Sequence, residues 1–415
     1  MKLLTGRMNA ISYIIENKIV TQMLRNIEIQ FPSNSILAII IYKNIQKGGN
    51  FMDVLIKGNA QISKLLNEWY KEIRSRNIDN AHCLKEEINS IIHNNEADSN
   101  LLLYYHLLDF GYKYLVDNLS ISKNSFDKIE SFDIPTDNFL SYYYHFYKAI
   151  HSNAVGNYNL AKEQYDKAEL LLKHIPDELE KAEFHYNLAT YHYHIYQALL
   201  AIKHGTKARD IFSKHESYEL KTAYCDNLLG LACTHLKEFE LAEEYFVTAM
   251  NTFQKQKNEK AILLVRHNLG LMYASQNLSS SAIRYLSEVV EKKPHHYKAI
   301  FVKAKEHVKL GEKEIACQLI EKGLTICNEL GNQEYQYRFA ILRELNKKAA
   351  ADKLEKAVLA GMDYFRNERL WEYVQEYTEA LAVQFHSEGN FEQGSKYFYL
   401  SYEAKKEIFN KEALK

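Results

Sequence analysis

A pattern of small residues recurs at intervals of about 40 positions along this chain. Each clear copy has a Gly or Ala, an Ala twelve positions later, a further residue four later and another three after that. Small residues at such positions let one helix approach another closely, so the pattern predicts stacked pairs of helices. The clear copies are Ala149, Ala161, Tyr165, Ala168; Ala189, Ala201, Gly205, Ala208; Gly230, Ala242, Phe246, Ala249; and Gly270, Ala282, Leu286, Val289, and weaker ones follow at Ala304, Ala316, Ile320, Gly323 and at Ala382, Gly394, Phe398, Ser401.

This is the tetratricopeptide (TPR) pattern, with a spacing longer than the usual period of about 34 residues. Only 15 Gly and 4 Pro interrupt 415 residues, which favours helices throughout. We therefore predict an all-α chain whose repeats, from 138 to 415, form a TPR superhelical solenoid. Turns are expected at Gly156-Asn157, Gly311 and Gly389-Asn390. Each repeat should touch only its neighbours, and the concave face should suit a peptide.

The repeats are preceded by a segment with a different organisation. Three helices are predicted, from Ile62 to Arg76, from Asn80 to Asn94 and from Asp98 to Asn118, with Asp79 and Asp98 as N-caps. We expect them to form a three-helix bundle within residues 52–120. A polar stretch over 121–137, which contains Pro135, is expected to be a linker and a hinge.

Residues 1–51 fit neither pattern. Their helical periodicity is interrupted by Pro32 and by Gly48-Gly49. The stretch Lys47–Met52 can be back-translated as a ribosome-binding site followed by a start codon. We therefore hypothesise that the natural protein begins at Met52 and that residues 1–51 are an untranslated extension.

Charge and cysteine content exclude several classes of function. The formal net charge is −1, and no sustained basic stripe is present, which argues against binding to nucleic acid. The five cysteines show no CxxC spacing, as expected of thiols in the cytoplasm. The longest early apolar run, Ile36 to Tyr42, is far shorter than the ~20 residues of a membrane span.

No cofactor or metal site is expected either. His185, His192 and His194 lie close in sequence, but without a carboxylate in metal-ligand spacing we expect them to be solvated or to line the groove. The 31 tyrosines lack interleaved basic residues, so they are interpreted as repeat core and groove wall.

From Met52 onward the chain resembles the Rap family of Gram-positive bacteria over about 360 residues. The matching segments are Leu66–Lys71, Leu101–Phe110, Glu180–Tyr186 and Asn268–Gly270. Members are peptide-controlled regulators of response regulators, active in quorum sensing, sporulation or competence. The resemblance implies that the N-terminal bundle binds a response regulator and that the TPR groove binds a short signalling peptide.

The resemblance also implies roles for residues of the bundle. Leu102 and Phe110 fall where family members touch the response regulator, although both could equally belong to the bundle core. A glutamine of phosphatase members, which orients the water that attacks the partner's aspartyl phosphate, corresponds to Ser99. We therefore expect phosphatase activity to be weak or absent, with an active aspartyl-phosphate phosphatase as the alternative.

For the peptide, the family asparagine that pairs with the ligand backbone corresponds to Asn268. An amide offers both a donor and an acceptor to a peptide unit. Asn187 and Asn227 occupy similar places in their repeats and should also face the groove, unless they are solvated or capping residues. A family aspartate that pairs with the peptide corresponds to His235, a departure from the family pattern. A generic TPR scaffold is the remaining alternative.

Overall fold

The computed structural model describes residues 60–92 and 98–412, and every regular element among them is helical. The predicted all-α class is therefore confirmed. The hypothesis about residues 1–51 lies outside the described residues. The helices are α3 (Ala60–Ser75), α4 (Ile78–Ile92), α5 (Ser99–Val116), α6 (Asp127–Glu130), α7 (Asn138–Ala154), α8 (Tyr158–Leu172), α9 (Glu178–His194), α10 (Ala198–Phe212), α11 (Glu219–His235), α12 (Phe239–Lys255), α13 (Glu259–Ser275), α14 (Ser279–Lys292), α15 (Tyr297–Lys309), α16 (Lys313–Leu330), α17 (Gln333–Lys347), α18 (Ala351–Asn367), α19 (Trp371–Ser387) and α20 (Phe391–Glu412), with short 3-10 turns η2 (Lys123–Phe126) and η3 (Glu216–Tyr218).

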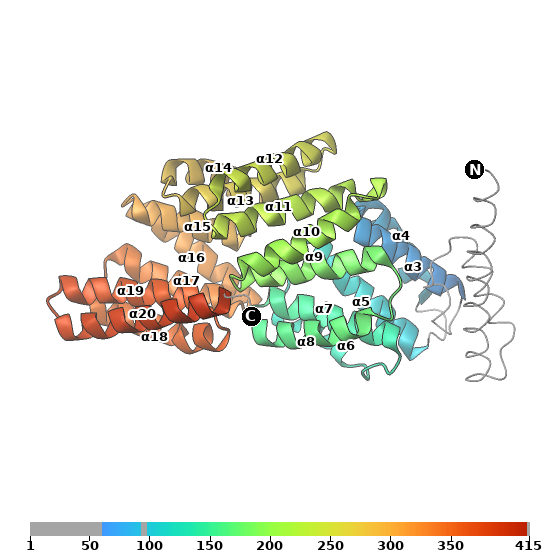
Figure 1. Cartoon of the computed structure of the whole chain (residues 1–415), viewed down its shortest axis with the longest axis horizontal. Coiled ribbons are helices and arrows are strands. Elements are labelled where there is room, and N and C mark those ends of the chain that lie inside the picture. Colours follow the sequence, from blue (N-terminus) through green and yellow to red (C-terminus); the bar gives the residue numbers. More distant parts are fainter. Residues whose placement is uncertain (1–59, 93–97, 413–415) are drawn as a thin grey trace, which may run out of the picture.

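Helices α3, α4 and α5 pack against one another at the N-terminal end of the described chain (Figure 1). Ile62, Leu66 and Trp69 recur three to four positions apart on α3, and all three are fully buried. The Asp98 side chain accepts a hydrogen bond from the Asn100 amide and caps α5, as predicted. The prediction for Asp79 was wrong, because α4 begins one residue earlier and Asp79 lies in its first turn.

The segment between α5 and α7 contains helical turns. Helices η2 and α6 occupy its middle, and Phe126 and Ile129 are buried in the core. The Phe126 ring meets Phe110 edge-on with a centroid distance of 5.2 Å. Part of this polar stretch is therefore packed against α5, while Asp137 begins α7 as its N-cap.

Within the described residues, α7 to α20 form seven consecutive helix pairs. The recurring small residues lie where these helices pack. An added Cβ on Gly230 of α11 would come within 2.7 Å of the Phe246 ring on α12, and one on Gly270 within 2.6 Å of Leu286. The pattern that predicted the repeats thus marks close helix approach. The predicted turns are also confirmed, since Gly156, Gly311 and Gly389 all have positive φ.

The array curves until repeats far apart in the sequence meet. The backbone amides of Tyr158 and Asn159, at the start of α8, donate to Glu368 Oε2 at 2.7 and 3.0 Å. Tyr364 on α18 donates to the Gly156 carbonyl at 2.8 Å. The expectation that repeats touch only their neighbours was therefore wrong, because the curvature of the array brings the end of α18 against the α7–α8 turn.

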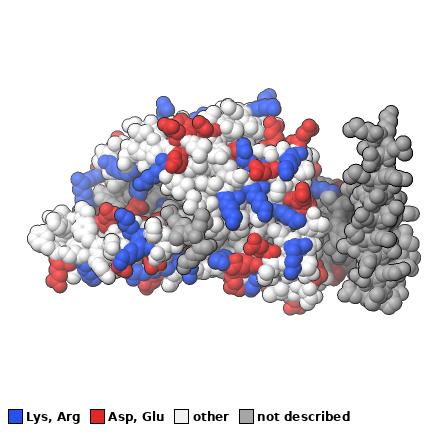
Figure 2. All heavy atoms as spheres, in the orientation of Figure 1, with Lys and Arg blue, Asp and Glu red and all other residues white. Residues whose placement is uncertain are grey.

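Acidic and basic side chains are mixed across the face of the molecule in Figure 2. In the described part of the chain, no helix combines the length and apolar character needed to cross a membrane.

Candidate functional site

The curvature of the helices encloses a large cavity of about 1160 Å³. Its walls come from α3 and α5 on one side and from α9, α11, α13, α15 and α17 on the others. The Nζ of Lys260 on α13 donates to the Leu115 carbonyl at 2.6 Å and also to the Val116 carbonyl. These bonds connect the end of α5 to the repeats at the edge of the cavity. The space is wide enough for several amino-acid residues of a ligand.

Two asparagine amides meet on the cavity wall. Asn268 of α13 donates through Nδ2 to Asn227 Oδ1 of α11 at 2.7 Å, and both side chains are buried from bulk water. An amide has two N–H donors and an acceptor oxygen, so this contact leaves the Asn268 oxygen and the Asn227 nitrogen for another partner. Together the pair presents the acceptor and donor that a peptide unit requires.

The other two predicted groove residues also line the cavity. Asn187 of α9 donates to the Glu183 carbonyl at 2.9 Å and to Glu183 Oε1 at 3.0 Å, so its nitrogen is occupied within its own helix. The His235 ring stacks between Tyr193 and Tyr196, with centroids 4.5 and 4.6 Å away. The wall at His235 is therefore a flat aromatic stack.

The clustered histidines of α9 have different environments. His185 is buried, and its Nδ1 lies 3.0 Å from Nδ1 of His204 on α10, so the prediction that it is solvated was wrong. His194 lines the cavity, as expected. Burial lowers the pKa of His185 and of the cavity residue His267 to about 3, so both rings are neutral at pH 7. Among the described residues, no cluster of side chains could hold a metal ion.

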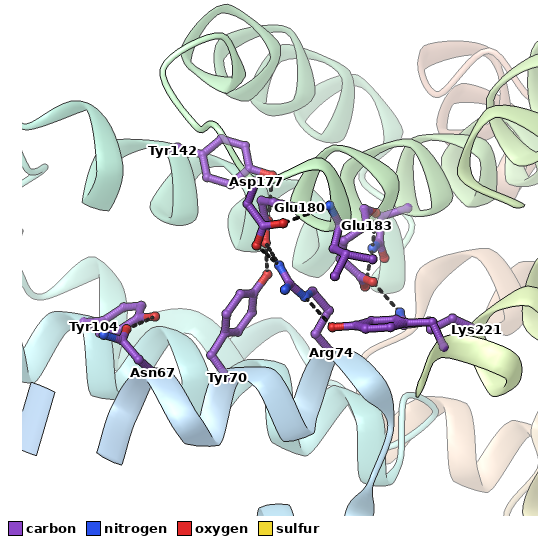
Figure 3. A network of polar contacts seen from close by, with 12 residues as sticks. Asn67, Tyr70, Arg74, Tyr104, Tyr142, Asp177, Glu180, Glu183 and Lys221 are labelled. Carbon is purple, nitrogen blue, oxygen red and sulfur yellow. Dashed lines mark hydrogen bonds and ion pairs between the residues drawn. The ribbon is translucent and has the colours of Figure 1, made fainter. Parts of the chain in front are cut away.

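A buried polar network joins α3 to the repeats beside the cavity (Figure 3). Arg74 of α3 reaches Asp177 at 2.7 Å and Glu180 of α9 at 3.2 Å, and its Nε donates to the Tyr218 hydroxyl at 3.2 Å. Tyr70 donates to Glu180 Oε2, and Tyr142 donates to Glu180 Oε1 at 2.9 Å. We call this set the α3–α9 joint.

The electrostatics of the joint follow from its burial. Arg74 is 3% exposed and Glu180 is 0% exposed. Burial raises the pKa of the Glu180 carboxyl, and the Arg74 charge opposes that rise. Next to it, Lys221 of α11 pairs with Glu183, and burial lowers the pKa of Lys221 to about 8. Each buried charge thus has a partner on another helix.

The residues predicted on the bundle lie in different places. Ser99 is exposed as the first residue of α5, and Leu102 is partly buried on the same helix. Phe110 is 2% exposed and packs against Tyr147, with ring centroids 6.0 Å apart. Phe110 therefore belongs to the core, and a partner could not contact it in this arrangement.

The sequence did not point to the α3–α9 joint. The two residues from α3, Tyr70 and Arg74, are more than 100 positions from their carboxylate partners, and no local spacing relates the two helices. One signal was present, because Arg74 follows Tyr70 by four positions and so lies on the apolar face of α3. A charge within an apolar helical stripe predicts a buried partner.

The sequence of this chain is similar to those of known proteins. Residues 57–117 match the family described as response regulator aspartate phosphatase H, N terminal. Response regulator aspartate phosphatase I of Bacillus subtilis (strain 168) is 25% identical over 359 residues, covering 84% of this chain and 91% of its own. Response regulator aspartate phosphatase H of the same strain is 25% identical over 370 residues, covering 86% of this chain and 98% of its own.

Solved structures share the fold. A Rap protein complexed with competence and sporulation factor superposes with a TM-score of 0.71 at 24% identity, covering 85% of this chain and 99% of that one. NprR in complex with its cognate peptide NprX has a TM-score of 0.63 at 18% identity, covering 83% of this chain and 99% of that one.

Proposed function

The chain belongs to the Rap family, and on that premise we propose that it is a cytosolic regulator with two partners, a short signalling peptide and a response regulator. In this proposal residues 138–415 bind the peptide, residues 52–120 bind the response regulator, and residues 121–137 link the two. The observation that carries the proposal is the Asn227–Asn268 amide pair on the wall of the large cavity.

The peptide is proposed to be five or six residues long and to lie extended along the cavity, with its backbone held by the amide pair. Asn187 and His235 would contact it from the same wall. A flat imidazole between two tyrosines suits an apolar or amide contact better than an ion pair. A solved structure of the same fold supports a peptide ligand, since the NprR structure described above is a complex with its cognate peptide.

The response regulator is proposed to dock on the exposed faces of α3–α5, with Leu102 within the contact. The burial of Phe110 argues for a core role for that residue. The family description of residues 57–117 supports this assignment, because it comes from response regulator aspartate phosphatases.

Phosphatase activity is proposed to be weak or absent. Hydrolysis of an aspartyl phosphate depends on placing water in line with the phosphorus. The Ser99 hydroxyl is two bonds from Cα, whereas a glutamine amide is four bonds away, so Ser99 should not reach a partner's active site. Asn100 carries an amide but points about 100° away around α5. On this view the protein acts mainly by sequestering its partner.

The test uses response regulators of the host, presented one by one to the immobilised protein and then assayed for phosphate release. We expect one of them to be retained, with little release by the wild type and faster release by Ser99→Gln. Asn100→Gln is the matched control, because it lengthens an amide that points elsewhere. Rapid release by the wild type that Ser99→Gln does not increase would establish the alternative, an active phosphatase. Retention of no response regulator would leave a generic scaffold.

The peptide is further proposed to tighten the superhelix and to shift α3–α5 through the segment around Pro135. The contacts of α8 with Glu368 and of α3 with α9 would have to change in that step. Small-angle scattering with and without saturating peptide tests it, and identical profiles would contradict it.

A further inference from the structure

The buried acidic side chains on the cavity wall are all neutralised by neighbours. Glu183 pairs with Lys221, and Glu334 accepts from Arg338 at 2.9 Å and from the Tyr158 hydroxyl at 2.7 Å. The remaining lining carboxylates, Asp117, Glu259 and Glu329, are exposed. The interior of the cavity therefore has no unpaired carboxylate for a basic ligand group.

Lys298 of α15 is in the opposite situation. Its side chain lines the cavity and is partly buried, and within the described residues neither a hydrogen bond nor an ion pair reaches its ammonium. Burial lowers the pKa of Lys298, with the Glu334 charge acting against that shift. The cavity thus contains a cation that has lost part of its hydration without gaining a partner.

The groups around Lys298 cannot supply the missing negative charge. Burial lowers the pKa of His194, His267 and His296, and the charge of Lys298 lowers each of them further. These rings are neutral at pH 7, and Glu334 is already held by Arg338 and Tyr158. An anionic group from a ligand would therefore meet an excess of positive charge here.

We propose that the cavity selects a peptide that carries a carboxylate, and that Lys298 binds this carboxylate while the Asn227–Asn268 pair holds the backbone. This inference rests on the proposed peptide-binding function and names the class of peptide. A charge-assisted hydrogen bond inside a cavity is stronger than one in water, so the contact contributes both affinity and orientation. A peptide whose only charged side chain is basic finds no counterpart inside the cavity.

The carboxylate has two sources, the C-terminus of the peptide or an Asp or Glu side chain. Four pools of synthetic pentapeptides separate them. The first has neutral side chains and a free C-terminal carboxylate, and the second is the same pool amidated at the C-terminus. The third is amidated and contains one Glu, and the fourth is amidated and contains one Lys. Each pool is incubated with the whole protein, and retained peptides are identified by mass spectrometry after ultrafiltration.

We expect retention from the first or the third pool, which assigns the carboxylate to the terminus or to a side chain. Lys298→Met should weaken binding of the retained peptide by about tenfold to a hundredfold. Lys298→Arg should keep most of the affinity, and Lys303→Met, on the same helix but outside the cavity, should keep all of it. Lys298→Met removes an unpaired cation and should fold normally, which circular dichroism checks.

Two results would overturn the inference in different ways. Equal retention from the second or fourth pool, with affinities unaffected by Lys298→Met, would leave peptide binding intact but remove the carboxylate preference. Retention from none of the pools would contradict the proposed peptide-binding function, and this inference with it.

Discussion

Helix α3 meets the repeats through a buried cluster of charges, whereas successive helices of the repeats pack closely where small residues face rings. At the α3–α9 joint, Arg74 reaches two carboxylates across more than 100 positions of sequence. We call the contacts between successive helices of the repeats the repeat joints. There, glycines such as Gly230 and Gly323 admit an aromatic ring from the neighbouring helix. Apolar packing tolerates small shifts and holds at any pH, while a buried ion pair depends on having both partners in place.

The difference suggests a division of labour. The repeat joints hold the walls of the cavity in a fixed curve, and the α3–α9 joint sets where the N-terminal bundle lies against them. A polar joint can be exchanged for water when it opens, because its groups hydrate well. The joint is thus the better place for a change of position to occur.

The largest effect is expected from breaking the polar joint. Arg74→Met leaves Glu180 buried without its cation and should lower the free energy of unfolding by about 3–5 kcal/mol. Urea denaturation measures the loss, and hydrogen exchange should locate it in α3 and α9. Lys162→Met, which breaks an exposed pair with Asp166, is the control and should change nothing measurable. Equal stability of Arg74→Met and wild type would mean that the joint does not hold α3.

A smaller loss is expected from crowding an apolar joint. A Cβ on Gly323 would lie 2.1 Å from the Phe339 ring, so Gly323→Ala should cost about 1–3 kcal/mol of stability. Gly394→Ala is matched to it, since its nearest neighbours would be 3.4 Å away. That variant should be neutral or slightly more stable in the same denaturation experiment. If both glycine variants behave alike, close helix approach is not what these glycines provide.

The third effect is a change of stability with pH. It comes from a buried histidine on the cavity wall, because the apolar contacts at the repeat joints contain no group that titrates. His267 has a folded pKa of about 3 against about 6.5 unfolded, because it is buried. The stability that depends on a neutral His267 is fully present above about pH 6.5 and is lost as the pH falls toward 3. By pH 5 this loss amounts to about 2 kcal/mol. We expect His267→Gln to lose less stability than wild type between pH 7 and 5. His174→Gln, at an exposed histidine, is the control, and parallel curves for all three proteins would contradict the prediction.

The two kinds of joint also explain what the sequence could predict. The repeat joints depend on residues with a fixed period, such as Gly230 and Gly270, and their spacing placed six of the seven helix pairs. The pair α17–α18 carries none of the copies and was not predicted by the spacing. The contacts of Arg74 with Asp177 and Glu180 have no period, so they could not be predicted. Closure of the superhelix at Glu368 was missed for a related reason, because it depends on the summed curvature of many repeats.

In the candidate site, too, the residues that follow the repeat period could be predicted and those that depend on distant segments could not. Asn227 and Asn268 lie at similar positions of adjacent repeats, and the periodicity brought both to the cavity wall. Phe110 was assigned by resemblance to a partner-binding surface, but its environment depends on Phe126 from a segment expected to be a linker. The unpaired state of Lys298 required knowledge of every neighbour, which only the folded structure supplies.

Calorimetric titration of a peptide that the wild type retains, into wild type and into Asn268→Ala, tests peptide binding in the cavity most directly. Asn268→Ala removes the donor to Asn227 and the acceptor offered to the peptide. We expect binding to weaken by about 1–3 kcal/mol, with folding intact by circular dichroism. Asn251→Ala, at an exposed amide on α12 outside the cavity, should bind as wild type does. Unchanged affinity of Asn268→Ala would contradict the assignment of the amide pair to the peptide backbone.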